Sequence, residues 1–331
     1  MRAIAALAIL VSLLSGAALE NQTGGSGAGA GLQPAGNGGT GFWEPGLEAA
    51  RRYARQRPGD VSFAIVGPSG RLAGFRKTRT APAASTIKAM LLAAWLRRPS
   101  VRHRRLGAAD RALLGPMIRA SDNAAAAQVA GIVGDRVARL GRAARMGDFE
   151  WEWEPGWIGG QSQISARDQA RFMLRYPRYL PKRHRRYARR LLASIVPWQR
   201  WGIADARPRG WRLYFKGGWG INDDGVGVVN HQVAFLERGG CRVALAILTE
   251  HNPTTADGAE TQRGIAKRLL RGIDRAPCPS GRRRAALSRR LDLREERRDA
   301  LDTLAAGARA ELGRRAGLFP QSGEQLLARP R

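Results

Sequence analysis

The sequence predicts an α/β protein in which a helical block separates two regions that contain strands. The apolar residues Val61, Phe63 and Ile65 alternate with smaller ones, as in a half-buried strand. Residues 85–195, by contrast, have helical patterns along almost their whole length. Further elements are expected after this block: strands at 211–215, 231–237 and 241–249, then a helix over about 261–273. The order α/β, α, α/β indicates an α/β fold with an all-α insertion.

The first 18 residues predict a signal peptide. Met1-Arg2 precedes an apolar run from Ala3 to Leu14 and then small residues up to Ala18, which is typical of an export signal and its cleavage site. An uncleaved membrane anchor is the alternative, although the run is shorter than the roughly 20 residues that a spanning helix needs. We therefore expect an exported protein that is extracellular, periplasmic or associated with the cell wall. Only an uncleaved N-terminal segment would contact a membrane.

Three regions follow the signal peptide. Residues 19–42 are rich in glycine and have no apolar period, so we expect a flexible linker. Residues 43–276 are the expected folded domain, and these roughly 230 residues can bury a sizeable core. This domain opens with a basic amphipathic helix over 47–57. Residues 277–331 combine many arginines with alanine and leucine, which predicts a helical or disordered basic tail.

Residues 84–88, Ala-Ser-Thr-Ile-Lys, open a long apolar run that ends at Leu96. Because Pro82 cannot continue a helix backwards and Ser85 is a cap-type residue, we expect a helix to begin at about Ser85. At a spacing of three, Ser85 and Lys88 share a helix face, where a partly desolvated amine could take the proton of the hydroxyl. The serine would then be activated without histidine, and the first-turn amides would favour negative charge beside it.

Lysine is rare in this sequence, because only five of its 56 basic residues are lysine. Two of the five are Lys88, at the end of Ser-x-x-Lys, and Lys216, at the start of the short motif Lys216-Gly217-Gly218. An amine can give up its proton and act as a base, whereas a guanidinium in a protein cannot. The composition therefore supports Lys88 as a general base and, less specifically, Lys216 as a cation that binds substrate.

Two further motifs accompany Ser-x-x-Lys. Ser121-Asp122-Asn123 follows the helical run 109–120, and Lys216-Gly217-Gly218 ends an alternating strand. In this order and setting, the three resemble the Ser-x-x-Lys, Ser-Asp-Asn and Lys-Thr-Gly motifs of class A β-lactamases and penicillin-binding proteins. The third motif departs from the pattern, since glycine replaces threonine at position 217. The resemblance covers roughly residues 43–275.

The resemblance implies a two-lobed β-lactamase/transpeptidase-like fold, in which an antiparallel sheet flanked by helices carries an inserted all-α lobe and the cleft between the lobes holds the active site. It also implies an acyl-enzyme on Ser85, with Lys88 as base and Ser121 as proton relay to the leaving nitrogen. Asn123 would hold a substrate amide, while Asp122 would brace the turn from behind. The alternative for this turn is a helix cap without catalytic function.

At the third motif, the resemblance implies a strand edge that binds substrate. Lys216 would supply a cation, and Gly218 would let a substrate backbone approach closely. The backbone N–H groups of Trp219 and Ser85 would form an oxyanion hole. Without a hydroxyl at position 217, one group that captures a substrate carboxylate is missing. An ordinary glycine-rich hairpin loop over 217–224 is the alternative.

Residues 153–155, Trp-Glu-Pro, resemble the Ω-loop segment that carries the deacylating glutamate of this family. Glu154 would hold the hydrolytic water, with Glu152 as the next candidate and a solvated acidic turn as the alternative. The asparagine expected four residues after the glutamate is Ile158 here. The neighbouring tryptophans, including Trp157, indicate packing more than a platform for sugars.

Cofactors and partners leave few signals in the sequence. We expect no metal, no cofactor and no Ser-His-Asp triad, because the histidines lack metal-ligand spacing; they are His103, His184, His231 and His251. Cys241 and Cys278 are expected to pair in an exported chain. The net charge of +29 suits anionic envelope polymers more than nucleic acid, because aromatic and basic residues do not alternate.

The sequence therefore predicts an exported serine acyl hydrolase of the β-lactamase type, in which Ser85 attacks β-lactams or related amides and esters. A role in β-lactam breakdown and antibiotic resistance would follow. Two alternatives stay open. One is a cell-wall D,D-peptidase or esterase on the same scaffold, and the other is a non-catalytic envelope-binding module that retains the fold.

Overall fold

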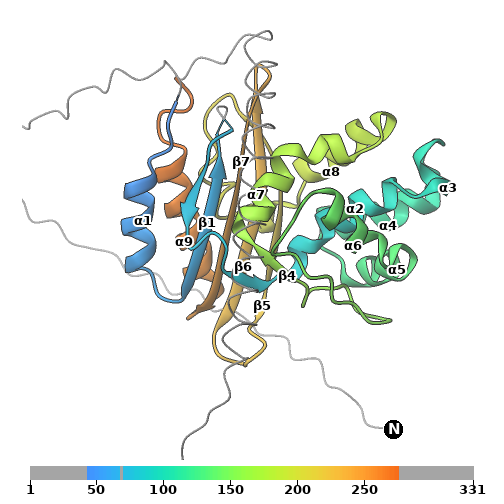
Figure 1. Ribbon diagram of the computed structural model, residues 1–331, viewed down its shortest axis with the longest axis horizontal. Helices are drawn as coiled ribbons and strands as arrows, with labels where there is room; N and C mark the ends of the chain where they lie inside the picture. The colour runs from blue at the N-terminus through green and yellow to red at the C-terminus, as the bar shows by residue number, and fades with distance from the viewer. Residues whose placement is uncertain (1–42, 68–69, 276–331) are drawn as a thin grey trace, which may run out of the picture. The chain divides into compact units, whose positions relative to one another are not determined.

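The computed structural model describes residues 43–67 and 70–275, so the expected signal peptide, linker and tail lie outside the described residues. At its centre is a five-stranded antiparallel sheet with the strand order β2-β1-β7-β6-β5 (Figure 1). Its strands are β1 (Asp60–Val66), β2 (Leu72–Phe75), β5 (Arg212–Ile221), β6 (Val228–Arg238) and β7 (Cys241–Asn252). A separate two-stranded sheet pairs β3 (Thr80–Pro82) with β4 (Gln163–Ser165).

The pairing of β1 with β7 joins the two ends of the folded domain. In this register Val61 lies opposite Thr249 and Phe63 lies opposite Ile247. All the helices between α2 and α8 lie in the chain between these two strands. The predicted fold class is therefore confirmed: an antiparallel sheet of terminal strands, flanked by helices, with a helical block inserted.

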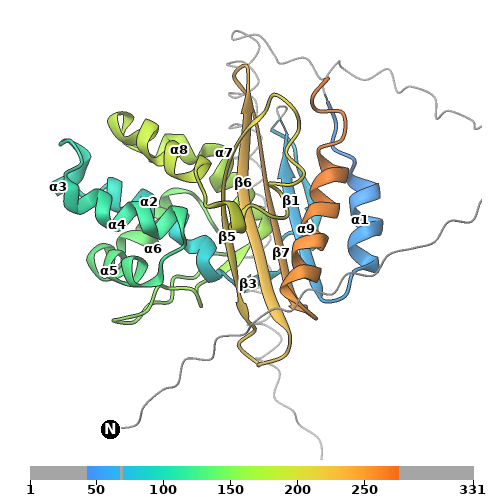
Figure 2. The same ribbon diagram turned by 180° about the vertical axis from the view of Figure 1, so that it is seen from behind.

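Helices cover both faces of the sheet (Figures 1 and 2). α1 and α9 pack together on one face, and α7 packs on the other face against β7, β1 and β6. The α-helices are α1 (Leu47–Gln56), α2 (Lys88–Leu96), α3 (Pro99–Arg102), α4 (Ala108–Arg119), α5 (Asn123–Val133), α6 (Arg136–Ala143), α7 (Ala166–Arg175), α8 (Arg185–Ala193) and α9 (Thr255–Leu269). Short 3₁₀ helices are η1 (Ala84–Ile87), η2 (Tyr176–Tyr179), η3 (Lys182–His184) and η4 (Pro197–Gln199).

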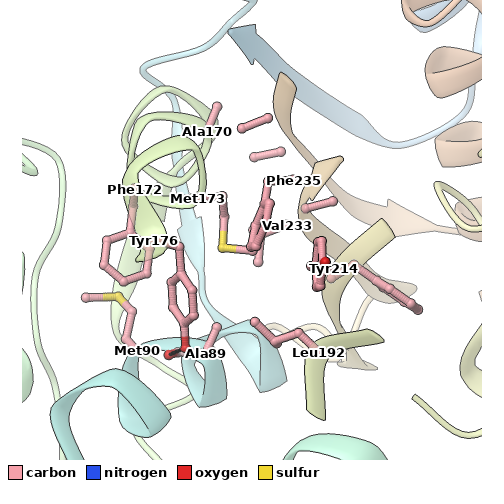
Figure 3. Packing of buried hydrophobic residues seen from close by; sticks show 14 of the residues in the cluster. Ala89, Met90, Ala170, Phe172, Met173, Tyr176, Leu192, Tyr214, Val233 and Phe235 are labelled. Atoms are coloured by element: carbon pink, nitrogen blue, oxygen red, sulfur yellow. Dashed lines mark hydrogen bonds between the residues drawn. The ribbon is translucent and has the colours of Figure 1, made fainter. Parts of the chain in front are cut away.

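Helix α2 is the centre of the helical block, since all nine of its residues are buried. The hydroxyl of Tyr176 donates to the carbonyl of Ala89 at 2.8 Å and so ties the end of α7 to α2. On the sheet, the rings of Tyr214 and Phe235 stack with centroids 4.5 Å apart and face this packing (Figure 3). Burying a large apolar side chain contributes about 1.5–3 kcal/mol, so this core holds α2 firmly within the helical block.

The helical stretch predicted over 85–195 is wrong in one part. After α6 the chain leaves helical structure, and β4 pairs with β3, with Ala81 opposite Ile164. The helix expected at Ser85 also begins differently, since η1 precedes an α-helix that starts only at Lys88. Sequence periodicity could not reveal this pairing, because β3 and β4 are three residues each and depend on one another.

Two boundaries near the C-terminal end were also predicted wrongly. β5 does not end at Lys216 but continues to Ile221, because β6 offers a paired partner along its whole length. α9 begins at Thr255 rather than near residue 261. The side chain of Thr254 caps it by accepting a hydrogen bond from the N–H of Asp257 at 3.1 Å.

Two observations bear on the expectation of export. Cys241, the first residue of β7, is disulfide-bonded. The other cysteine of the sequence, Cys278, lies outside the described residues. Within 43–67 and 70–275, no helix has both the length and the apolar character needed to span a bilayer.

Candidate active site

Ser85 lies on η1, the short turn that links β3 to the buried helix α2. The N–H of the preceding residue, Ala84, donates to the carbonyl of Gly160 at 2.8 Å, so the loop 150–162 holds this turn. Ala84 has a φ of +46°, a conformation that is strained for a residue with a side chain. The Ser85 side chain is half-buried, and its hydroxyl makes no hydrogen bond to another described residue.

Lys88 is fully buried one turn after Ser85. Its Nζ donates to the carbonyl of Ser121 at 2.6 Å, to Asn123 Oδ1 at 2.6 Å and to Ser121 Oγ at 3.2 Å. Since these partners engage its three donors, Lys88 is not hydrogen-bonded to Ser85 in this state. Burial lowers the pKa of Lys88 to about 8, while the negative charge of Asp122 acts in the opposite direction. An appreciable fraction of this amine is therefore neutral near neutral pH.

Lys216 reaches the same hydroxyl from the sheet. Its Nζ lies 2.9 Å from Ser121 Oγ and donates to the carbonyl of Gly217 at 2.6 Å. Burial, reinforced by the positive charge of Lys88, lowers the pKa of Lys216 well below that of an ordinary lysine. The two amines thus share one hydroxyl, and a neutral amine can accept the proton that the hydroxyl donates. This arrangement can move a proton between Lys88, Ser121 and Lys216.

The turn Ser121-Asp122-Asn123 serves both as a helix cap and as part of the site. Asp122 caps α5, because its Oδ1 accepts a hydrogen bond from the N–H of Ala125 at 2.7 Å. Ser121, with a φ of +58°, and Asn123 both turn their side chains to Lys88. The turn can therefore cap α5 through Asp122 and take part in the site through Ser121 and Asn123.

Gly218 brings the edge strand β5 directly against the start of the central helix. A Cβ at this position would lie 2.8 Å from the backbone N of Ser85 and 2.9 Å from that of Thr86. β5 pairs only with β6, so its other edge is open to η1. The carbonyl of Gly217 faces the site, because it accepts from Lys216. In a β-strand the N–H and C=O groups of every second residue point to the same edge. The N–H of Trp219 therefore points to the same edge as the carbonyl of Gly217. Trp219 and Ser85 can thus both present backbone N–H groups.

Glu154 is not joined to this cluster. Its side chain is exposed and makes no hydrogen bond or ion pair with another described residue, and the same holds for the side chain of Glu152. The backbone carbonyl of Glu154 accepts from the N–H of Trp157 at 3.0 Å, so the segment forms a tight turn. The structure therefore brings Lys88, Ser121, Asn123 and Lys216 into contact, with Ser85 and Gly218 beside them, and leaves both glutamates outside these contacts.

Two parts of the site were not predicted from the sequence. Gln161 Nε2 donates to Asp223 Oδ1 at 3.2 Å, which joins the loop 150–162 to the hairpin after β5. Trp201 packs against Trp219 with ring centroids 5.9 Å apart, beside Gly217. The segment Pro-Trp-Gln-Arg-Trp at 197–201 was a readable signal, because two tryptophans in five residues are unusual in a surface segment.

Comparisons with known proteins agree with this geometry. Residues 110–273 match the model of the beta-lactamase enzyme family. No curated protein matches the sequence. Among solved structures, a class A β-lactamase from Mycobacterium abscessus is similar, with a TM-score of 0.59 and 18% identity over 69% of this chain and 99% of that one.

Two further solved structures have similar folds. A β-lactamase from Sphaerobacter thermophilus has a TM-score of 0.59 and 21% identity, over 70% of this chain and 98% of that one. A mutant of PBP-A, solved as an acyl-enzyme complex with penicillin G, has a TM-score of 0.56 and 18% identity, over 69% of this chain and 95% of that one. At these identities the similarity establishes the fold.

We expect Gly218→Ala to damage the site and Gly220→Ala to leave it intact. The added methyl at 218 would collide with backbone atoms of the Ser85 turn, whereas a Cβ at 220 meets nothing within 4 Å. Displacing the reacting groups by about 1 Å lowers the rate on the order of 100-fold. The measurement is the rate at which acylating reagents modify Ser85 in the two variants. Equal rates would show that β5 does not need to approach Ser85 so closely.

Proposed function

We propose that this protein, a member of the class A β-lactamase-like serine hydrolase superfamily, forms an acyl-enzyme on Ser85 with β-lactams or related amides and esters. The observation that carries the proposal is the buried cluster in which Lys88 and Lys216 share the hydroxyl of Ser121, one turn from Ser85. Buried amines with lowered pKa values beside a serine are the arrangement that activates a hydroxyl without histidine.

In the first step, Ser85 Oγ bonds to the substrate carbonyl carbon. Neutral Lys88 accepts the proton of the Ser85 hydroxyl, after substrate has displaced its present hydrogen bonds enough to free a lone pair. The carbonyl oxygen becomes an oxyanion, for which the N–H groups of Ser85 and Trp219 are the proposed donors. The positive end of the helix that begins here stabilises the same charge.

In the second half of this step, the bond from the carbonyl carbon to the leaving nitrogen or oxygen breaks. The leaving atom takes the proton of the Ser121 hydroxyl, which Lys88 or Lys216 then replaces, so that no net proton is lost from the cluster. Asn123 is the proposed partner of a substrate amide: its Oδ1 accepts from Lys88, so its Nδ2 is the group that would donate to the amide carbonyl. Water later hydrolyses the ester on Ser85.

The cell-wall D,D-peptidase or esterase remains the alternative reaction on this scaffold. It shares the acylation step and differs in the acyl donor. PBP-A, whose mutant was captured with penicillin G on the enzyme, makes a penicillin a suitable first probe for both. A non-catalytic envelope-binding module is the alternative of a different class, and lack of acylation would identify it.

Export and envelope association are also part of this proposal. The sequence of residues 1–18 supports a signal peptide, and the disulfide at Cys241 suits an oxidising compartment. The net charge of +29 supports binding to anionic envelope polymers. Cleavage after Ala18 would be visible as the N-terminal residue of protein recovered outside the cytoplasm.

We expect a fluorescent penicillin or an activated ester to modify wild-type protein once per chain, on Ser85. Ser85→Ala should abolish this adduct, because the nucleophile is gone. Ser100→Ala is the matched control, since it removes an exposed serine of α3 and should leave labelling unchanged. Intact-mass and peptide mass spectrometry make the measurement. If no acylating probe modifies the folded wild-type protein, the envelope-binding module is the better interpretation.

We expect the acylation rate to rise with pH through about 8. The pKa of Lys88 is lowered to about 8, so the amine is mostly protonated below this pH and cannot accept the Ser85 proton, and it is mostly neutral above it. The measurement is the second-order rate of Ser85 acylation between about pH 6 and about pH 10. Lys88→Arg keeps the charge but not the base, and it should react at least about 100-fold more slowly. A rate that falls with pH, or an unimpaired arginine variant, would exclude Lys88 as base.

We expect the acyl-enzyme to accumulate and to decay slowly. Hydrolysis needs a water held by a carboxylate, and Glu154, the proposed group, is exposed and has no hydrogen bond that fixes it. The adduct should persist longer in Glu154→Gln than in wild type, with Glu152→Gln as the matched comparison. Intact-mass decay after removal of excess substrate measures this. Equal decay in wild type and Glu154→Gln would remove Glu154 from the mechanism, and a slower decay only in Glu152→Gln would replace it with Glu152.

A further inference from the structure

The described chain exposes six large apolar side chains. They are Ile132, Trp157, Trp198, Trp219, Ile221 and Val226. All but Ile132 belong to segments that border the candidate site: the loop 150–162, η4, β5 and the hairpin after β5. Scattered apolar residues on a surface need no explanation, whereas a group of them on segments that border a candidate nucleophile indicates a surface that binds apolar groups.

Gly217 leaves a small notch, the space that a Cβ would take, between two tryptophan rings. A Cβ there would lie 3.7 Å from the ring of Trp201 and 3.8 Å from that of Trp219, so glycine leaves the space between them unfilled. The two rings are inclined at 77° and form the two walls of a corner. Trp198, three residues before Trp201, lies on η4 and is 74% exposed.

The segment that carries these tryptophans is fixed in position. The buried amide of Gln232 donates to the carbonyl of Trp201 at 2.8 Å and accepts from the N–H of Ile203 at 2.7 Å. At the other end, Gln199 donates to the carbonyl of Ala120, the residue before Ser121, at 2.9 Å. The aromatic corner is therefore held against both β6 and the Ser121 turn, which preorganises it for a ligand.

No lysine of the site is accessible to an anionic group at this corner. Lys88 and Lys216 are both 0% exposed, and the hydrogen bonds that the structure gives their amines all lie within the cluster. Burial also lowers the pKa of Lys216 well below its ordinary value, so a smaller fraction of this amine is protonated and positively charged. Arg200 lies on the same segment, but its guanidinium donates to the carbonyl of Ala193 at 3.3 Å and lies over the ring of Phe215.

We propose that the corner formed by Trp201, Trp219 and Gly217 binds the leaving group of the substrate, and that this group is a neutral aromatic ring rather than a carboxylate. The inference rests on the proposed acyl transfer to Ser85. The side of the leaving group follows from Ser121, the proposed proton donor to the leaving atom, whose Oγ contacts Lys216 next to the corner. An aromatic ring gains contact with both indoles, whereas a carboxylate would lose hydration without gaining a cation.

The test compares two esters of the same acid, phenylacetylglycine. One has a meta-tolyl leaving group, which is neutral, and the other has a meta-carboxyphenyl leaving group, which is anionic. Their kcat/KM values are each divided by the rate of alkaline hydrolysis of the same ester, so that intrinsic reactivity cancels. We expect the corrected kcat/KM to be roughly tenfold or more higher for the tolyl ester. Equal values, or a preference for the carboxylate, would overturn the proposal.

Variants locate the preference at the corner. Trp201→Ala and Trp219→Ala should each lower kcat/KM for the tolyl ester by about three- to tenfold and change the carboxyphenyl ester less. Gly217→Thr should reduce the preference, because it fills the notch and adds a hydroxyl, and its Cβ contacts are of ordinary length. Ile132→Ala is the matched control, an exposed apolar residue of α5 outside the group, and should leave both esters unchanged. A carboxylate preference that Arg200→Ala removes would identify Arg200 as an anionic anchor instead.

Labelling of Ser85 by a fluorophosphonate distinguishes failure of the proposed acyl transfer from failure of the leaving-group proposal. If the probe modifies Ser85 in wild type and in the tryptophan variants, the catalytic cluster is intact and the ester comparison decides the leaving-group proposal alone. If it modifies Ser85 in wild type but not in the tryptophan variants, those substitutions damaged the site. The leaving-group proposal is then decided by the ratio of the corrected kcat/KM values for the two esters in wild type and in Gly217→Thr. If no acylating or phosphonylating probe modifies wild-type Ser85, the proposed function fails, and the leaving-group proposal fails with it.

Discussion

The burial of two lysine amines around one serine hydroxyl is the constraint on which the site depends. Lys88 and Lys216 are both 0% exposed, and an amine removed from water without oxygen partners is strongly unfavourable. Those partners come from the turn before α5 and from the backbone of β5. Helix α2, the Ser121 turn and the edge strand therefore have to meet within hydrogen-bond distance before either lysine can be buried. Because the hydrophobic packing of α2 buries Lys88 as well, the core and the chemistry are parts of one arrangement.

The same requirement explains where the backbone is strained. Ala84 and Ser121 both have positive φ values, and each borders a residue or hydroxyl of the cluster. Such conformations cost of order 1–3 kcal/mol and persist only where surrounding structure imposes them. At Ala84 the imposing contacts are the carbonyl of Gly160 and the close approach of β5 at Gly218. Two of the described positive-φ residues other than glycine therefore lie in the turns that carry Ser85 and Ser121, beside Arg76, Arg145 and His251 elsewhere.

Local signals predicted most of the fold and the cluster, and non-local pairing accounts for the rest. The three-residue spacing of Ser85 and Lys88, and the capping residues at 121–123, are visible in the sequence because helices have a fixed period. Gly217 and Gly218 disfavour a strand, so the continuation of β5 through them could not be predicted without β6 beside it. The tryptophans at 198 and 201 were visible in the sequence, but the position of Trp201 beside Trp219 depends on Gln232, which is distant in the chain. The position of the Glu154 side chain had no local signal at all.

The pairing of β1 with β7 has a consequence for the order in which the molecule is assembled. Val61 contacts Thr249 across the sheet, so the central strands are separated by nearly the whole length of the domain. Such high contact order slows folding, because a long loop closes before the pairing stabilises it. Ser85 and Lys88 leave the ribosome early, but β5, β6 and β7 follow only near the end of the domain, before α9. Until β5 is in place, the strand edge that faces Ser85 does not exist. A nascent chain therefore has no assembled nucleophile until synthesis of the domain is nearly complete.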